Sequence, residues 1–187
     1  MAKGEQDQTL IEVFTVGHST RSEEEFVRIL DAHAINLLID VRTFPGSRRY
    51  PQFNKEALSE FLVGRHIEYR HFPSLGGRRK PNAESKNIAW RNASFRAYAD
   101  HMQSAEFKEG IKELLELASE KRIAVMCAEA VWWRCHRSVI ADYLKSIGVV
   151  VKHIIDVNTM EIHPYTSAAR IVEGKLSYEG LLTEDQS

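Results

Sequence analysis

Five side chains capable of chemistry occur within eleven consecutive positions of this chain. They are Cys127, Glu129, Cys135, His136 and Arg137. Thiols and carboxylates act as nucleophiles or bases, imidazoles move protons, and guanidinium groups hold anions. A single cysteine is more often a core residue than a reactive one, so each residue alone is weak evidence. Their concentration in one stretch makes it the strongest candidate for a functional site.

The elements expected around this stretch give it a position in the fold. The apolar run 123–126 is typical of a buried strand in a parallel sheet, and apolar spacing from Val139 to Ile147 predicts a helix. One thiol and one carboxylate therefore follow a strand, and the second thiol precedes a helix. Open α/β sheets bind ligands at the carboxyl ends of their strands. A helix N-terminus also favours anions and lowers thiol pKa values.

The rest of the chain predicts an α/β fold with a mainly parallel sheet of about five strands and helices on both faces. Strands alternate with helical segments, and the crossovers are long enough for parallel pairing. We expect a single domain over residues 11–156, a disordered N-terminus over 1–10, and a C-terminal extension over 157–187 packed on the same domain. The strands are expected at 11–16, 37–41, 67–71, 123–127 and 149–155.

Composition limits the classes of function. The chain has 187 residues, of which 43% are hydrophobic and 27% are charged, and its net charge is −1. These values are ordinary for a soluble globular protein. The net charge is too small to attract nucleic acid or a membrane to the protein as a whole. The N-terminus has no apolar signal region, and no apolar stretch approaches ~18 residues. We expect a cytoplasmic protein with reduced thiols and no membrane partner; the oligomeric state is left open.

Polar residues follow several of the expected strands. If the strands are parallel, these residues share one edge of the sheet and line one cleft. The alternative for each is structural, with Asp40 pairing with Arg42 and His18 capping a helix. The residues at the strand ends are His18, Ser19, Asp40, Arg42, Cys127 and Glu129.

Two loops add positive charge to this edge. One mixes Arg42, Arg48 and Arg49 with aromatic residues, and the other contains Arg78 and Arg79. Arginines and aromatic rings on loops suit phosphates and stacked bases, and Trp132 and Trp133 supply further rings. The alternative is a solvated surface balanced by nearby acids. Neither loop is a Walker motif or a dinucleotide fingerprint.

These motifs together resemble those of the domain-of-unknown-function 488 family, from about Thr15 to Ile155. The resemblance implies a compact α/β domain, and some members carry a DNA-repair label. It assigns no catalytic residue. The motifs are Thr15-Val16-Gly17-His18-Ser19, Leu38-Ile39-Asp40-Val41-Arg42, Pro45-Gly46-Ser47, Phe72-Pro73-Ser74-Leu75-Gly76-Gly77, Cys127-Ala128-Glu129 and Cys135-His136-Arg137.

The first functional hypothesis is an enzyme, such as a hydrolase, that acts on a nucleotide or on nucleic acid. A partly desolvated Glu129, or Asp40, would be the general base, and arginines would hold phosphate. The candidate catalytic residues are Glu129, Asp40, Cys127 and His136. The candidate substrate-binding residues are His18, Ser19, Arg42, Arg48, Arg49, Arg78, Arg79, Arg137, Trp132 and Trp133.

Two alternatives remain open. One is a cysteine-dependent enzyme of the sulfur-transfer or phosphatase-like kind, although the arginine nearest to phosphatase spacing, Arg134, is one residue too far from Cys127. The other is a nucleic-acid-binding or metal-binding module without catalysis. A structural zinc would use Cys127, Cys135 and His136, with His18 as a fourth ligand. We predict no cofactor.

Overall fold

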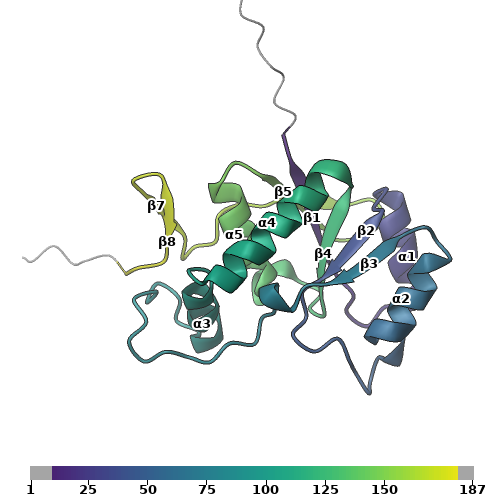
Figure 1. The fold of residues 1–187 in the computed structure, drawn as a ribbon, viewed down its shortest axis with the longest axis horizontal. Coiled ribbons are helices and arrows are strands. Elements are labelled where there is room, and N and C mark those ends of the chain that lie inside the picture. The colour runs from purple at the N-terminus through teal and green to yellow at the C-terminus, as the bar shows by residue number, and fades with distance from the viewer. Residues whose placement is uncertain (1–9, 181–187) are drawn as a thin grey trace, which may run out of the picture.

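Parallel strands form the centre of the molecule, which a computed structural model describes over residues 10–180. The sheet order is β3-β2-β4-β1-β5-β6, and all pairings are parallel except that of β5 with β6 (Figure 1). The predicted mainly parallel sheet is therefore confirmed. The strands are β1 (Glu12–Gly17), β2 (Leu37–Asp40), β3 (Glu68–His71), β4 (Ile123–Cys127), β5 (Val150–Ile154) and β6 (Met160–Ile162).

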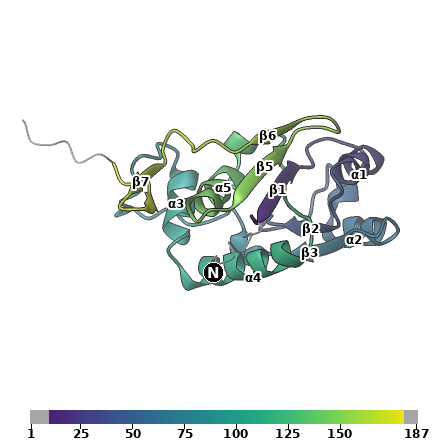
Figure 2. The same cartoon turned by 90° about the horizontal axis from the view of Figure 1, so that it is seen from above.

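Helices cover both faces of this sheet, as predicted. The first two pack against one face, and the other three pack against the opposite face (Figure 2). Each pair of layers encloses its own apolar core, because a helix buries one stripe of side chains against the sheet. The helices are α1 (Glu23–Ala32), α2 (Lys55–Val63), α3 (Ala93–His101), α4 (Ala105–Glu120) and α5 (Arg137–Ser146).

Alternation along β4 decides which layer its last residue faces. All five residues of this strand are buried, as expected for a strand covered on both sides. Ala124 and Met126 belong to the core under α1 and α2, whereas Val125 and Cys127 belong to the core under α3, α4 and α5. The period of two along a strand therefore directs the Cys127 thiol toward the layer that contains α5.

Side chains cap three of the five helix starts, those of α1, α3 and α4. At α1, Ser22 and Glu25 form a capping box in which each side chain accepts the main-chain N–H of the other. Helix α5 begins without a side-chain cap. Asn54 precedes α2, but its side chain does not cap the helix. Its Oδ1 accepts from the Ser47 N–H at 2.6 Å instead, which ties down the arginine-rich loop before α2.

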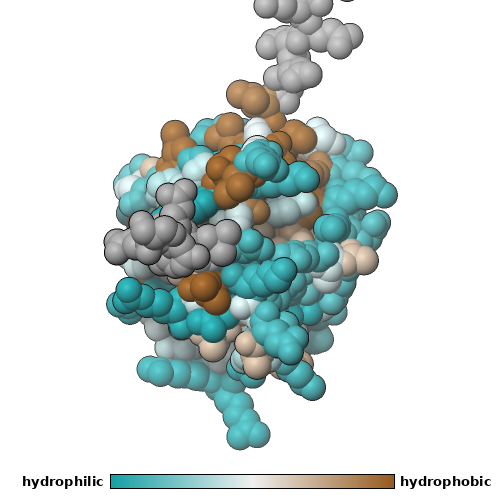
Figure 3. Space-filling view, turned by 90° about the vertical axis from the view of Figure 1, so that its left-hand side faces the viewer, coloured by the Kyte–Doolittle hydropathy of each residue, from teal (hydrophilic) through white to brown (hydrophobic). Residues whose placement is uncertain are grey.

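The C-terminal extension continues the fold beyond the expected boundary at residue 156. Strand β6 adds an antiparallel edge to the sheet, and β7 (Arg170–Val172) forms a hairpin with β8 (Lys175–Ser177). Figure 3 shows the end of the molecule toward this hairpin, where apolar and hydrophilic side chains are mixed. The predicted disorder of residues 1–10 falls, apart from Leu10, outside the described residues.

Between residues 10 and 180, no helix is long and apolar enough to cross a membrane.

Candidate active site

The carboxyl ends of the parallel strands meet at one edge, as the sequence predicts. Gly17 is in register with Cys127, and Asp40 is in register with both Met126 and His71. A cleft of about 1010 Å³ opens at this edge. Its walls include the loops after β1, β2 and β4 and the segment before α5.

The two cysteines of the chain lie together in this cleft. Their Sγ atoms are 2.6 Å apart, and both thiols are free. A disulfide bond has a length of about 2.05 Å, so the two sulfurs are close enough to form one when an oxidant takes up two electrons. A short 3₁₀ helix at Trp132–Arg134 turns the chain after β4 and returns Cys135 to the start of α5. The strand end and the helix start thus bring together thiols that are eight positions apart.

The buried side chain of Arg137 contacts this thiol pair. Its guanidinium Nε donates to Cys127 Sγ at 2.9 Å, and its Nη2 donates to the Glu129 carbonyl at 2.6 Å. The side chain is only 1% exposed, and within residues 10–180 it forms no ion pair with a carboxylate. A buried cation without a counter-ion is costly, so this guanidinium strongly favours a negative charge on the neighbouring sulfurs.

The thiol pair loses its first proton easily and its second with difficulty. Burial opposes ionisation of Cys135, but the hydrogen bond from the Cys127 thiol and the charge and hydrogen bonds of Arg137 outweigh it and lower the Cys135 pKa to about 7. Burial and the adjoining Cys135 sulfur raise the pKa of Cys127 well above its ordinary value. Cys135 is therefore the thiolate near neutral pH, and Cys127 remains a thiol.

His136 faces the same sulfur. Its Nε2 lies 3.1 Å from the Val41 carbonyl, which can only accept, so Nε2 carries the proton. Its Nδ1 is then an unprotonated acceptor, 3.4 Å from Cys135 Sγ. Burial lowers the pKa of His136, which keeps the imidazole neutral. This nitrogen can accept a hydrogen bond from the Cys135 thiol while the thiol is protonated.

Two glycines make this packing sterically feasible. A Cβ atom on Gly17 would lie 1.9 Å from the Glu129 carbonyl oxygen, and one on Gly77 would lie 2.5 Å from His136 Nδ1. Real side chains do not approach so closely. The absence of a side chain at both positions lets the loop after β4 and the imidazole close over the strand ends.

Asp40 and Arg42 form a structural pair under one wall of the cleft. The Asp40 carboxylate is fully buried and accepts from Arg42 Nε and Nη2, at 2.9 and 2.6 Å from the nearest oxygens, and from the Tyr69 hydroxyl at 2.6 Å. Burial, with the Asp40 charge and hydrogen bond adding to it, raises the pKa of Tyr69 far above its ordinary value, so the hydroxyl remains a donor. These contacts occupy the carboxylate, and the expectation that Asp40 is a general base is not supported by this geometry.

His18 extends this pair toward the solvent. Arg42 Nη1 lies 3.2 Å from His18 Nε2, so this nitrogen must accept and Nδ1 donates to the Ser19 carbonyl at 2.9 Å. Burial, reinforced by the charge of Arg42, lowers the pKa of His18 to about 4. Ser19 has a φ of 53°, an uncommon left-handed conformation for a residue with a side chain, at the rim of the cleft.

The prediction that the Glu129 carboxylate is partly desolvated is wrong. Its side chain is exposed, because the loop after β4 turns outward at Ala128. The residue contributes its main-chain carbonyl to Arg137, and Arg42 is already paired with Asp40. No buried ion pair involves Glu129 among the described residues.

The predicted phosphate-binding arginines divide into two groups. Arg42, Arg49 and Arg78 line the cleft. Arg48 is exposed but does not line it. Arg79 donates to the carbonyls of its own loop and pairs with Glu106, so it anchors the loop.

Neither of the tryptophans that were predicted to stack on a base lines the cleft. Trp132 is buried, stacks on His153 at 4.3 Å and donates its Nε1 hydrogen to Glu161. Trp133 is exposed but lies outside the cleft lining. The aromatic residues that do line the cleft are Phe44, Tyr50 and Phe95.

Several cleft residues were not among the predicted site residues, and three of them come from unexpected places. Arg134 was considered only for its spacing from Cys127, and Ser94 and Phe95 lie at the start of α3. The only sequence signal for Arg134 was its position between the two cysteines. Nothing local indicated that the start of α3 would reach this edge.

A metal centre is not assembled from the residues proposed for zinc. His18 and His136 each direct Nε2 to a protein partner, Arg42 and Val41 respectively. In residues 10–180, no group of three or more His, Cys, Asp or Glu side chains is arranged to hold a metal ion.

The fold and the site define an α/β protein with a paired-thiol site at the carboxyl edge of a parallel sheet. The chain belongs to the family described as domain of unknown function DUF488, whose model matches residues 22–144. This match includes both cysteines, His136 and Arg137. We found no match among curated proteins or solved structures.

Proposed function

We propose that this protein is a cysteine-dependent enzyme that reacts with oxidised sulfur in an anionic substrate. The observation that carries the proposal is the contact of Cys127 and Cys135 in the cleft, beside a buried guanidinium. A low-pKa thiol with an adjacent second thiol is the arrangement that thiol–disulfide exchange requires. It shares its cysteine nucleophile with the sulfur-transfer or phosphatase-like enzyme that the sequence leaves open as an alternative, but the reaction proposed is thiol–disulfide exchange.

In the first step, the Cys135 thiolate attacks one sulfur of a substrate disulfide. A mixed disulfide forms between Cys135 and that sulfur, the substrate S–S bond breaks, and the other half leaves as a thiolate that takes a proton from solvent. Cys135 is the attacking group because Arg137 stabilises its thiolate and it lines the cleft. His136 Nδ1 accepts a hydrogen bond from the Cys135 thiol, and when the thiol ionises its proton passes to solvent, because His136 stays neutral.

In the second step, Cys127 resolves the mixed disulfide. Its sulfur attacks Cys135 Sγ, its proton passes to the departing substrate thiolate, and a Cys127–Cys135 disulfide forms. The substrate has then gained two electrons and two protons as two thiols, and the protein has lost them. A dithiol reductant must return the protein to its starting state.

The cleft lining supports an anionic substrate with an aromatic part. Four arginines line it, one of which, Arg42, is neutralised by the buried Asp40, and the carboxylate in the lining is that of Glu129. Arg78 lies over the Phe44 ring at 5.5 Å, and Arg49 lies over Tyr50 at 5.4 Å. Arginine forks bind phosphates and carboxylates, and exposed rings stack on bases. The arginines that line the cleft are Arg42, Arg49, Arg78 and Arg134.

The same lining favours a second candidate, an enzyme that acts on a nucleotide or on nucleic acid, including a repair role. In that case Cys135 would be the nucleophile. Glu129 and Asp40 would not act as the general base, because neither carboxylate is placed for that role. Tight binding of nucleotides without any thiol–disulfide exchange would favour this second candidate.

The test uses dithiobis(nitrobenzoate), an anionic aromatic disulfide whose released thiolate absorbs visible light. The unmodified protein should release two equivalents and end as a Cys127–Cys135 disulfide. Cys127→Ser should release one equivalent rapidly and retain a mixed disulfide, visible by mass spectrometry. Cys135→Ser should react slowly, because it lacks the low-pKa thiol. Equal rates for Cys135→Ser and the unmodified protein would refute the proposal.

A further inference from the structure

A chain of buried hydrogen bonds runs from Arg137 away from the thiol pair. Its Nη1 donates to Thr15 Oγ1 at 3.2 Å, and Thr15 Oγ1 lies 2.7 Å from His153 Nδ1. His153 Nε2 lies 2.8 Å from His163 Nδ1, and His163 Nε2 lies 2.9 Å from Asp142 Oδ1. All five side chains are at most 1% exposed. We call Arg137, Thr15, His153, His163 and Asp142 the relay.

The carboxylate at the far end sets the direction of every bond in the relay. A carboxylate only accepts, so His163 Nε2 carries a proton, and in the neutral imidazole Nδ1 then accepts from His153. His153 Nδ1 then accepts from the Thr15 hydroxyl, whose oxygen is left to accept from Arg137. Burial, followed by the neighbouring His163, lowers the pKa of His153 to about 2, so this imidazole stays neutral. The Asp142 carboxylate thus determines the tautomers of both His163 and His153.

The C-terminal extension holds that anion. Thr166 donates its main-chain N–H to Asp142 at 2.9 Å and its hydroxyl at 2.5 Å, and the Tyr178 hydroxyl donates at 2.8 Å. His163 also belongs to the extension. Four hydrogen bonds to Asp142 therefore come from residues beyond position 156.

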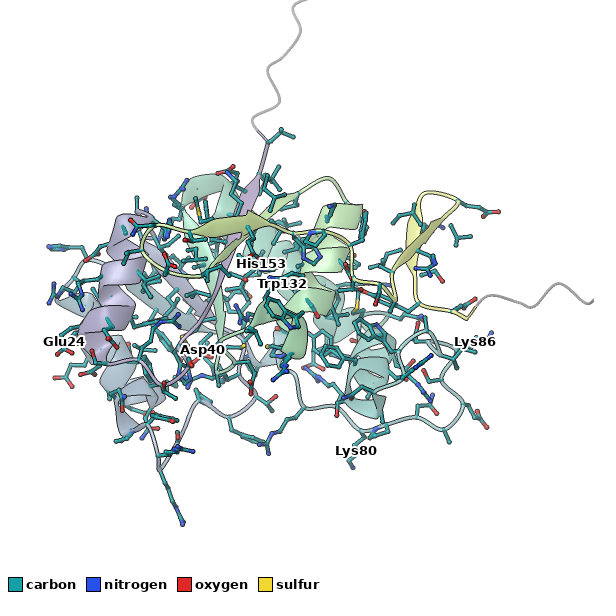
Figure 4. The ribbon with its side chains drawn as sticks, turned by 180° about the vertical axis from the view of Figure 1, so that it is seen from behind. Glu24, Asp40, Lys80, Lys86, Trp132 and His153 are labelled. Atoms are coloured by element: carbon teal, nitrogen blue, oxygen red, sulfur yellow. The ribbon has the colours of Figure 1, made fainter. Side chains whose placement is uncertain are left out.

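Trp132 covers the middle of the relay. Its ring stacks on His153 with an interplanar angle of 6°, and Figure 4 shows the two labelled side chains next to each other, away from Asp40. Its Nε1 donates to Glu161 in β6, which is also in the extension. The stack keeps water away from the imidazole and ties the loop after β4 to the edge strand.

We propose that the relay holds the Arg137 guanidinium against Cys127, and that the C-terminal extension thereby positions the reactive thiol pair. The inference rests on the proposed function for the role of that pair. Thr15, His153, His163 and Asp142 are positioning residues, since none of them contacts a sulfur.

The physical argument concerns how a buried guanidinium is fixed. Arg137 has three anchors, the Cys127 sulfur, the Glu129 carbonyl and the Thr15 hydroxyl. Each bond of the relay polarises the next, so the Thr15 oxygen is a better acceptor than an isolated hydroxyl. Without that anchor the long side chain gains rotational freedom and its Nε leaves the sulfur for part of the time.

The test measures the pKa of the reactive thiol from the pH dependence of iodoacetamide alkylation. The charged and titratable groups that act on the pair are Arg137 and His136 from α5 and its start, and Tyr98 from α3, and none of them is changed. Thr15→Val removes only the hydroxyl from a residue of similar shape, and Thr15→Ser restores it as the matched control. We expect Thr15→Val to raise the thiol pKa by about one unit, which lowers the alkylation rate at pH 6 about tenfold. Thr15→Ser should match the unmodified protein.

A second variant tests whether the effect reaches the extension. His163→Gln keeps a donor for Asp142 but removes the acceptor for His153, so we expect the same direction of change, by roughly threefold or more in rate. Glu173→Gln, an exposed position of the extension that is off the relay, should leave the rate unchanged. Melting temperatures of all variants identify any loss of folding.

Unchanged thiol pKa values in Thr15→Val and His163→Gln would overturn the inference even if both proteins melt earlier, because the relay would then only stabilise the fold. An effect of Thr15→Val without one of His163→Gln would overturn the role of the extension. Failure of the proposed function has a different signature, the loss of two-equivalent release from dithiobis(nitrobenzoate) by the unmodified protein.

Discussion

The Nε atom of Arg137 lies 2.9 Å from the Sγ atom of Cys127, and both groups are buried. The hydrogen bond joins the first residue of α5 to the last residue of β4. A neutral thiol is a poor partner for a buried guanidinium, whereas a shared thiolate neutralises it. The contact therefore links the acidity of the thiol pair to the placement of one helix against one strand.

Arg137→Lys should separate the charge from the geometry of the guanidinium. Lysine retains a positive charge but cannot donate to Cys127, Glu129 and Thr15 at the same time. We expect the thiol pKa to rise and alkylation at pH 6 to slow by about tenfold. Lys112→Arg, on the exposed surface of α4, is a control for a change of basic residue. Alkylation as fast as in the unmodified protein would show that the guanidinium does not stabilise the thiolate.

The reaction with dithiobis(nitrobenzoate) should depend on pH through the Cys135 thiol. Its pKa is lowered to about 7, so the thiolate is scarce at pH 5.5 and predominates at pH 8.5. The rate of the first exchange should therefore rise through about pH 7 and level off above it. The raised pKa of Cys127 adds no step in this range. Stopped-flow absorbance measures the profile, and a single rise near pH 9 would contradict the assignment of the nucleophile.

Arg48 and Arg49 are adjacent in sequence but differ in their relation to the cleft. Arg49 lines it and Arg48 does not. Arg49→Ala should weaken binding of a fluorescent nucleotide or oligonucleotide several-fold and reduce the salt slope by about one. Arg48→Ala is the matched control and should bind nearly as well as the unmodified protein. Fluorescence anisotropy at several salt concentrations distinguishes them, and equal losses would mean that binding occurs outside the cleft.

Gly17→Ala should disturb the site through the main chain. The added Cβ would lie 1.9 Å from the Glu129 carbonyl, so the loop after β4 must move. We expect a loss of about 1–3 kcal/mol in the free energy of unfolding, together with slower thiol exchange. At Gly46 the nearest atom to an added Cβ is 4.0 Å away, so Gly46→Ala is the control. Urea denaturation measures both, and a neutral Gly17→Ala would contradict the close approach.

Asp40→Asn should reduce stability, and Glu129→Gln should leave thiol exchange nearly unchanged. Loss of a catalytic base would instead reduce activity. Asp40 is a buried partner of Arg42, so removal of its charge should reduce the free energy of unfolding by about 3–5 kcal/mol. Glu129 is exposed and acts through its carbonyl, so Glu129→Gln should keep thiol exchange within about twofold, as surface substitutions usually do. A loss of about 100-fold in Glu129→Gln, the scale of a missing general base, would restore the carboxylate mechanism.

Local patterns in the sequence determined most of the fold. Apolar runs predicted the five parallel strands, and the start of α1 is also local, because its capping box depends on two residues only three positions apart, Ser22 and Glu25. The meeting of Cys127 and Arg137 at the carboxyl edge also followed from sequence, since parallel strands end on one side. The short strand β6 escaped prediction, because its three residues are exposed and its pairing with β5 is tertiary.

Only the tertiary structure decided the chemistry of the site. Sequence placed Glu129 beside a buried strand but not the outward turn of its loop, which depends on the close approach to Gly17. The bond between Thr15 and His153 joins residues 138 positions apart, beyond any periodicity. The acidity of Cys135 arises from desolvation and charge in three dimensions. Residue types and spacing therefore identified where the reactive groups lie, whereas burial and long-range hydrogen bonds determined which of them can react.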